Sequence, residues 1–122
     1  MKYAYDLLVI GGGSGGLTVA IGGAQIGAKT MLVEKEKIGG DCTHAGCIPS
    51  KTLIKAGKMA QQCREMSQSS PSLKEVLSHV EQTVSSVYAQ ETPEAIGRHG
   101  VSVRIDTATF LDDHTVRLSS GE

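Results

Sequence analysis

Residues 6–20 read DLLVIGGGSGGLTVA, a short apolar run that passes directly into five glycines within the six residues Gly11–Gly16. The apolar residues up to Ile10 predict a buried strand that begins near Tyr5. Clustered glycines are typical of a tight turn or of a close approach between the backbone and another group. The small and apolar residues that follow, 17–28, predict a helix that packs closely on a sheet, with Gly27 as its terminator.

A second strand is predicted at Lys29–Glu34, which makes residues 5–34 a βαβ unit with parallel strands. The turn satisfies the pattern GxGxxG at Gly11, Gly13 and Gly16, between a strand and a helix. In such a unit these glycines permit the tight turn, the approach of a pyrophosphate and close helix–strand packing. Glu34 ends the second strand, where a carboxylate binds the ribose of a dinucleotide and disfavours a 2′-phosphate.

The composition of the 122 residues excludes several classes of protein. Twelve basic and thirteen acidic residues give a net charge of −1, and aromatic residues make up only 3%, so a nucleic-acid surface is not expected. The apolar run Leu7–Ile10 is far too short to span a bilayer, and Asp6 interrupts any signal-peptide core. With three cysteines and no signal sequence, we expect a reducing, cytoplasmic location in which a close cysteine pair performs redox or metal chemistry.

Three further segments, together with the βαβ unit, predict an α/β fold. Residues 42–66 are mostly helical in pattern. Residues 72–91 predict an amphipathic helix, with Ser72 and Glu75 placed as a capping box. Residues 101–119 contain three short strand patterns and predict a small β-meander.

Cys42 and Cys47 are separated by four residues. In a regular helix their Cα atoms would be roughly 8–9 Å apart, beyond the limit of about 7 Å for a disulfide. A redox-active pair therefore requires a distorted turn, which Gly46 and Pro49 permit. A thiol at the start of a helix is also expected to have a lowered pKa, which favours the thiolate.

Residues 39–51 read GGDCTHAGCIPSK, which resembles the redox-active segment of the class I pyridine nucleotide-disulfide oxidoreductases. This family includes dihydrolipoamide dehydrogenase, glutathione reductase and mercuric reductase. Its pattern, GG-T-C-x-N-x-G-C-x-P-[ST]-K, follows an N-terminal FAD-binding βαβ unit. The two motifs occur here in the same order, so the resemblance implies a Rossmann-like FAD-binding fold.

The resemblance also implies roles for individual residues. Cys47 would be the thiolate against the flavin, Cys42 the interchange thiol that meets the substrate, and Lys51 the cation near the reactive flavin nitrogen. Electrons would pass between NAD(P)H, FAD and the cysteine pair, and then to a disulfide, dithiol or soft-metal substrate. The expected cofactor contacts are Gly11, Gly13, Ser14, Gly15, Gly16, Glu34, Lys35, Gly40, Asp41, Cys42, Gly46, Cys47 and Lys51.

Two residues depart from the family's commonest pattern. Asp41 replaces Thr, and His44 replaces Asn, which leaves the substrate open. Two other hypotheses remain: a non-catalytic dinucleotide-binding module with a Cys42–Cys47 thiol switch, and a metal-binding module that uses Cys42, His44, Cys47 and Cys63. The cysteine spacing is not a common zinc pattern, so no native metal site is expected.

Members of this family are several-fold longer and have separate NAD(P) and dimer-interface domains. We therefore expect this chain to be the N-terminal part of an FAD domain, an incomplete domain from a homodimeric enzyme with a small-molecule or small-disulfide substrate. The NAD(P)H site would lie on a domain absent from the chain. The 122 residues alone are not expected to turn over NAD(P)H.

Overall fold

The structure is a computed structural model and describes residues 3–122. The chain divides into two compact units. The first contains the residues up to Gly40 together with Gln90–Glu122, and the second contains Asp41–Ala89. Within the described residues, no helix is both long enough and apolar enough to cross a membrane.

The first unit is built on a parallel sheet in the order β1-β2-β3. Its strands are β1 (Leu7–Ile10), β2 (Thr30–Glu34) and β3 (Val101–Ile105). The parallel pairing of β1 with β2 aligns Leu7 with Thr30 and confirms the predicted βαβ arrangement. The α/β, Rossmann-like fold class is likewise confirmed, because a helix connects the two parallel strands.

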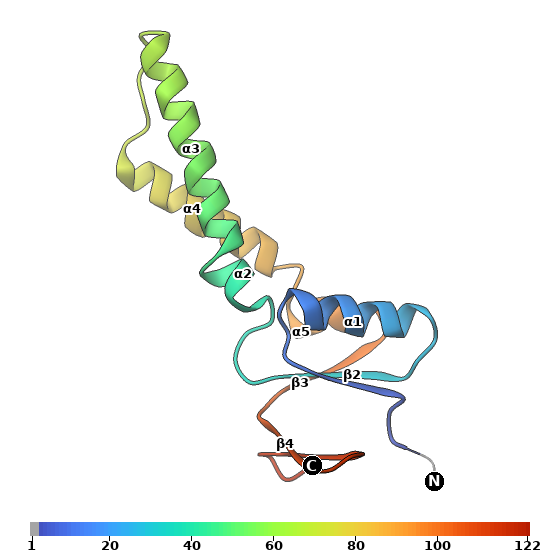
Figure 1. The fold of residues 1–122 in the computed structure, drawn as a ribbon. Helices are drawn as coiled ribbons and strands as arrows, with labels where there is room; N and C mark the ends of the chain where they lie inside the picture. Colours follow the sequence, from blue (N-terminus) through green and yellow to red (C-terminus); the bar gives the residue numbers. More distant parts are fainter. Residues whose placement is uncertain (1–2) are drawn as a thin grey trace. The chain divides into compact units, whose positions relative to one another are not determined.

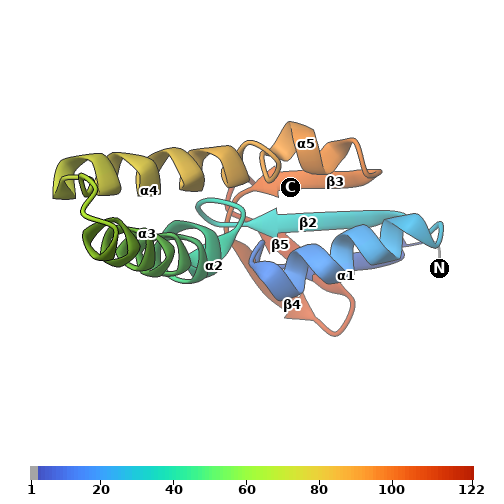
Figure 2. The same ribbon diagram turned by 90° about the horizontal axis from the view of Figure 1, so that it is seen from above.

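Two helices, α1 (Ser14–Gln25) and α5 (Pro93–Gly97), cover one face of this sheet (Figures 1 and 2). A core of buried apolar side chains fills the space between the helices and the sheet. β2 is the central strand, so its first four residues are buried on both faces. The buried residues of this core are Val9, Ala20, Leu32, Ile38, Ile96 and Val101.

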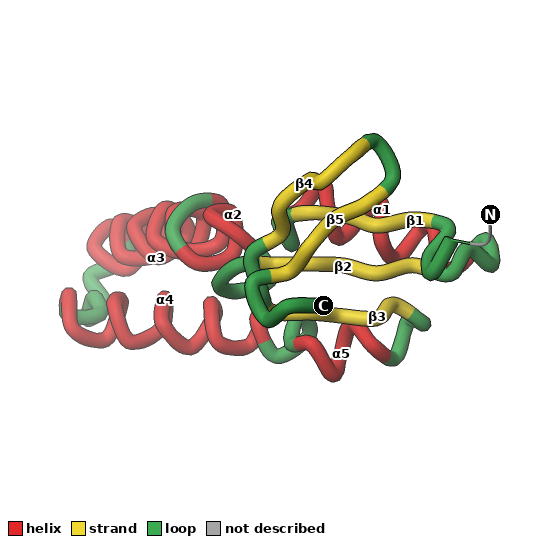
Figure 3. The backbone as a smooth tube through the Cα atoms, turned by 90° about the horizontal axis from the view of Figure 1, so that it is seen from below, coloured by secondary structure: helices red, strands yellow, loops and turns green. Residues whose placement is uncertain are grey.

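The opposite face of the sheet carries an antiparallel hairpin formed by β4 (Ala108–Asp112) and β5 (Thr115–Leu118) (Figure 3). Met31 and Val33 of β2 point to this side and pack against Leu118. Alternation along β2 thus supplies side chains to both cores, as the period of two in a strand requires.

Two details of the sequence prediction are wrong. The first strand of the meander predicted over 101–119 is not part of an antiparallel meander. This strand, β3, follows α5 and pairs with β2 in the parallel sheet. Only β4 and β5 form an antiparallel pair. β1, predicted as a buried strand, pairs with β2 alone within the described residues, and its Leu8 and Ile10 are 36% and 46% exposed.

The second unit is helical and contains α3 (Cys47–Glu65) packed alongside α4 (Leu73–Tyr88) (Figure 2). The short helix α2 (Gly40–His44) precedes them. The predicted capping box is present: the Glu75 N–H donates to Ser72 Oγ at 3.3 Å, and the Ser72 N–H donates to Glu75 Oε2 at 2.7 Å. The mostly helical pattern predicted at 42–66 corresponds to two helices, α2 and α3, with an interruption at Gly46.

Candidate functional site

The glycine turn forms the beginning of α1. Gly13 is the N-cap, so the helix starts three residues before the predicted Leu17. Gly11 has φ +100°, a left-handed conformation that favours glycine. At Gly16, an added Cβ would lie 1.8 Å from the Gly11 carbonyl oxygen, so only glycine fits this close approach.

Glu34 closes the other side of the turn from the end of β2. Its Oε2 accepts a hydrogen bond from the Gly12 N–H at 2.6 Å, and its Oε1 accepts one from the Glu36 N–H at 2.9 Å. The carboxylate is therefore held beside the glycine turn by two backbone donors. Lys35 is exposed and lies 3.9 Å from the Glu36 carboxylate, as an ion pair on the surface.

The segment that follows β2 returns to the glycine turn. The Gly39 N–H donates to the Gly12 carbonyl at 2.7 Å. An added Cβ at Gly40 would lie 3.1 Å from Gly13 Cα, and both Gly39 and Gly40 have positive φ. The adjacent glycines at 39 and 40 thus allow two backbone segments to touch.

The helix N-terminus in this turn fits a phosphate group. No side chain caps α1 at Gly13, and its first turn holds no acidic residue. Added Cβ atoms at Gly13 and Gly15 would meet no atom within 4 Å, so the space beside these backbone groups is open. Helix N–H groups without side-chain partners and the positive end of the helix dipole together bind anions. Ser14, the first residue of α1, is also exposed.

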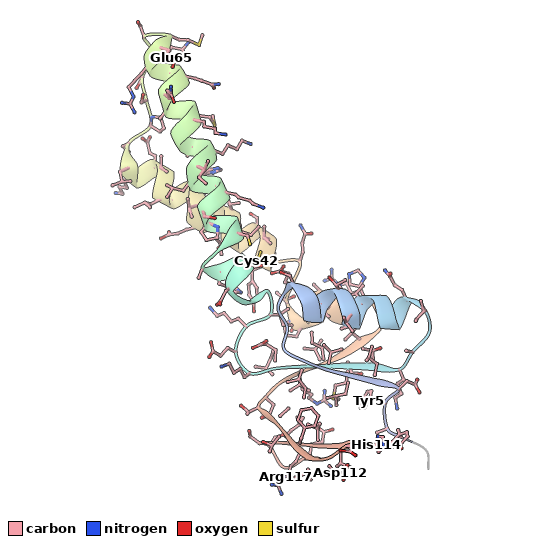
Figure 4. The ribbon with its side chains drawn as sticks, viewed as in Figure 1. Tyr5, Cys42, Glu65, Asp112, His114 and Arg117 are labelled. Atoms are coloured by element: carbon pink, nitrogen blue, oxygen red, sulfur yellow. The ribbon has the colours of Figure 1, made fainter. Side chains whose placement is uncertain are left out.

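The cysteine pair lies at a break between two helices. Cys42 is on α2, and Cys47 is the first residue of α3, at the end of that helix opposite to Glu65 (Figure 4). Gly46 separates them, and a Cβ added there would lie 2.9 Å from the Asp41 carbonyl oxygen. The helical path is thus distorted between the cysteines, as a redox pair with this spacing requires. Pro49 lies in the first turn of α3, where its missing N–H costs no helical hydrogen bond.

The two thiols interact directly. A hydrogen bond to Cys42 favours the protonated form of Cys47 and raises its pKa above the ordinary value; desolvation and the Cys42 charge act in the same direction. Lys51, one turn further along α3, opposes this with its positive charge. The lowered pKa expected for a thiol at a helix N-terminus is therefore wrong for Cys47 in this dithiol state, because the hydrogen bond to Cys42, desolvation and the Cys42 charge together outweigh the Lys51 charge.

The remaining predicted positions lie on the same short helix. Asp41 is exposed in the first turn of α2, and its carbonyl accepts the Ala45 N–H at 2.9 Å. His44 ends α2 and packs its ring against Tyr88 of α4. Across residues 3–122, no three His, Cys, Asp or Glu side chains gather to hold a metal ion.

The profile of one protein family, described as pyridine nucleotide-disulphide oxidoreductase, matches residues 5–122. The chain belongs to this family. The order of its parts agrees with class I of these oxidoreductases, because the glycine turn with Glu34 precedes a Cys-x4-Cys segment.

Relatives of this chain include two dihydrolipoyl dehydrogenases and a mercuric reductase. The Bacillus subtilis dihydrolipoyl dehydrogenase is 50% identical over 68 residues, which cover 56% of this chain and 14% of the relative. Dihydrolipoyl dehydrogenase 2 of Haloarcula marismortui is 38% identical over 95% of this chain and 26% of its own length. The Staphylococcus aureus mercuric reductase is 30% identical over 94% of this chain and 22% of its own length. The chain thus spans about a quarter or less of the length of these relatives.

The sequence prediction missed two residues that contact the candidate site residues. Gly12 lies in the glycine cluster, but its contact with Glu34 joins residues 22 positions apart and leaves no mark in the GxGxxG spacing. Tyr88 belongs to the apolar face of α4, and nothing in the local sequence pairs it with His44. Both contacts depend on how separate elements pack.

Proposed function

We propose that this chain is the FAD-binding and dithiol-bearing part of an NAD(P)H-dependent disulfide oxidoreductase. The observation that carries the proposal is the hydrogen-bonded Cys42–Cys47 pair at the break between α2 and α3. In the sequence, the pair follows a glycine turn whose helix N-terminus is open and has no side-chain cap, which supports the same function. The family membership and the named relatives agree with it.

The residues of the glycine turn would bind the pyrophosphate of FAD. The N–H groups at the start of α1 supply donors, and Gly13 and Gly15 leave room for the phosphates. Glu34, held by the Gly12 N–H, would accept hydrogen bonds from the adenosine ribose hydroxyls. A carboxylate there disfavours a 2′-phosphate, so this site selects FAD over NADP.

When bound, FAD would accept a hydride from a reduced pyridine nucleotide and would deliver two electrons to a disulfide. The Cys42–Cys47 disulfide takes up two electrons and two protons and becomes the dithiol seen in the structure. For the balance, the hydride donor would supply both electrons and one proton, and solvent would supply the second proton. The dithiol then reduces a substrate disulfide by thiol–disulfide exchange, or binds a soft metal ion through its thiolates.

Lys51 and the hydrogen bond between the thiols determine where the protons reside. The Cys42 hydrogen bond keeps the proton on Cys47, whereas Lys51 favours the Cys47 thiolate. Without that hydrogen bond, desolvation and the Cys42 charge would still raise the pKa of Cys47, and the Lys51 charge is the largest influence that lowers it. We therefore assign Lys51 the role of stabilising negative charge at Cys47.

Equilibrium binding of FAD to the 122-residue chain, followed by flavin fluorescence, tests the cofactor assignment. We expect saturable binding that Glu34→Gln weakens. Thiol titration before and after oxidation tests the pair: oxidation should remove two of three thiols in the parent and both thiols in Cys63→Ser. A chain that oxidises reversibly at this pair but binds no FAD would support the thiol-switch alternative. A chain that does neither contradicts the proposal.

A further inference from the structure

His44 lies between the two cysteines in the sequence and contacts a helix far along the chain. Its ring is 5.1 Å from the ring of Tyr88, centroid to centroid, with the planes inclined by 64°. This T-shaped arrangement is a favoured geometry for aromatic pairs and contributes about 0.5–1.5 kcal/mol beyond simple burial. Both side chains are half-buried.

The contact anchors a helix that has little stability of its own. α2 contains five residues, too few to be stable in isolation. Its Thr43 side chain is buried, with 3% exposed, and the His44 ring packs against Tyr88, the last residue of α4. α4 packs along α3, which begins at Cys47. The ring contact therefore connects the helix that carries Cys42 to the helices that position Cys47.

We propose that the contact between His44 and Tyr88 positions the cysteine pair for disulfide formation. It holds Cys42 close to Cys47 in the dithiol state, in the hydrogen-bonded arrangement that the structure shows. Closing the S–S bond then orders little further backbone, so the contact raises the effective concentration of one thiol at the other. The inference rests on the proposed function only in taking Cys42 and Cys47 as the redox pair.

Losing the contact should shift the pair toward the dithiol. The dithiol would then sample arrangements with the sulfurs apart, and closing the disulfide would restrict them again. Converted to an equilibrium ratio, the range for an aromatic pair predicts a shift of about 2- to 12-fold. In the test reaction, two Cys thiols and one glutathione disulfide become one Cys42–Cys47 disulfide and two glutathione thiols.

The experiment uses the full 122-residue chain with Cys63→Ser, so that only the pair reacts. The protein is equilibrated with mixtures of reduced and oxidised glutathione, quenched by alkylation and weighed by mass spectrometry. Tyr88→Leu should require about 2- to 12-fold more oxidising glutathione mixtures for half-formation of the disulfide. Tyr88→Phe keeps the ring and should retain the parent equilibrium.

Two further variants separate positioning from loss of structure. His44→Asn removes the other ring at a half-buried position and should give the same shift, and combining it with Tyr88→Leu should add little. Leu77→Ala shortens an exposed apolar side chain of α4 away from the contact and should leave the equilibrium unchanged. Circular dichroism verifies that each variant is folded.

A parent pair that oxidises reversibly, with both Tyr88→Leu and His44→Asn matching it or shifting toward the disulfide, would overturn the inference. A parent pair that never forms the disulfide contradicts the proposed function instead. The two failures are therefore distinct.

Discussion

Gly16→Ala provides the sharpest test of the glycine turn. The added Cβ would lie 1.8 Å from the Gly11 carbonyl oxygen, 3.0 Å from the Gly11 carbonyl carbon and 3.5 Å from Val9 Cγ1. To reach even 3.0 Å from the oxygen, the two backbone segments must separate by about 1.2 Å, the difference from the present 1.8 Å. Because the obstacle is backbone, rotation of a side chain cannot relieve it.

The separation would lift the start of α1 from the end of β1. Gly11 is fixed there, because its N–H donates to the Val33 carbonyl at 2.8 Å. Overpacking of this kind costs about 1–3 kcal/mol, and backbone obstacles belong at the upper end. Total stabilities of small domains are about 5–15 kcal/mol, so a loss of about 3 kcal/mol is large and readily measured.

Urea unfolding followed by circular dichroism measures the loss. We expect a lower midpoint for Gly16→Ala and weaker FAD binding in the absence of urea. Gly22→Ala is the matched control on the same helix, because its Cβ would meet no atom within 4 Å. Alanine is favoured over glycine inside a helix by about 1 kcal/mol, so this control should raise the midpoint. A Gly16→Ala chain that unfolds at the parent urea concentration would refute the close-approach argument.

Three further predictions concern other local contacts. Gly46→Ala places a Cβ 2.9 Å from the Asp41 carbonyl oxygen and should slow disulfide formation between Cys42 and Cys47 in a glutathione buffer; an unchanged rate contradicts this. Ser72→Ala removes the α4 cap and should lower stability by about 1 kcal/mol in urea unfolding, whereas Ser78→Ala, in the middle of α4, should have little effect. Hydrogen bonds from Ser120, Thr107 and Ser119 lower the pKa of Asp106 to about 2, so its contribution to stability is complete above its unfolded pKa and is lost as the pH falls toward 2. Asp106→Asn should flatten that acid limb in a series of unfolding curves, and a limb identical to the parent's would count against the assignment.

Local sequence was sufficient where one segment determines its own structure. The capping box at Ser72 and Glu75 needs only residues three apart, and it forms as predicted. Gly27 was predicted to end α1. It lies two residues after the last helical residue, Gln25, and has the positive φ of +90° that is typical of a residue just past a helix end. The parallel pairing of β1 and β2 also followed from local order, because a strand, a helix and a strand in close succession have few ways to pack.

Local sequence failed where the partner of a segment is distant. The strand at Val101–Ile105 has the same local pattern whether it pairs with β2 or β4, and packing of α5 on the sheet accompanies its pairing with β2. The pKa of Cys47 was mispredicted for a different reason, because Cys42 is only five residues away but the contact between the thiols depends on the distorted backbone at Gly46. Its position at a helix start predicts a lowered pKa, but the Cys42 thiol reverses the direction.

The sequence by itself determined the family of this protein and predicted which of its residues react. The GxGxxG turn, Glu34 and the Cys-x4-Cys segment are short-range patterns whose chemistry depends on residue type and spacing. Only the tertiary structure decided that Gly12 holds Glu34, that β3 joins the parallel sheet and that His44 meets Tyr88. These contacts join residues far apart in the chain, and their formation depends on the burial of apolar side chains between whole elements.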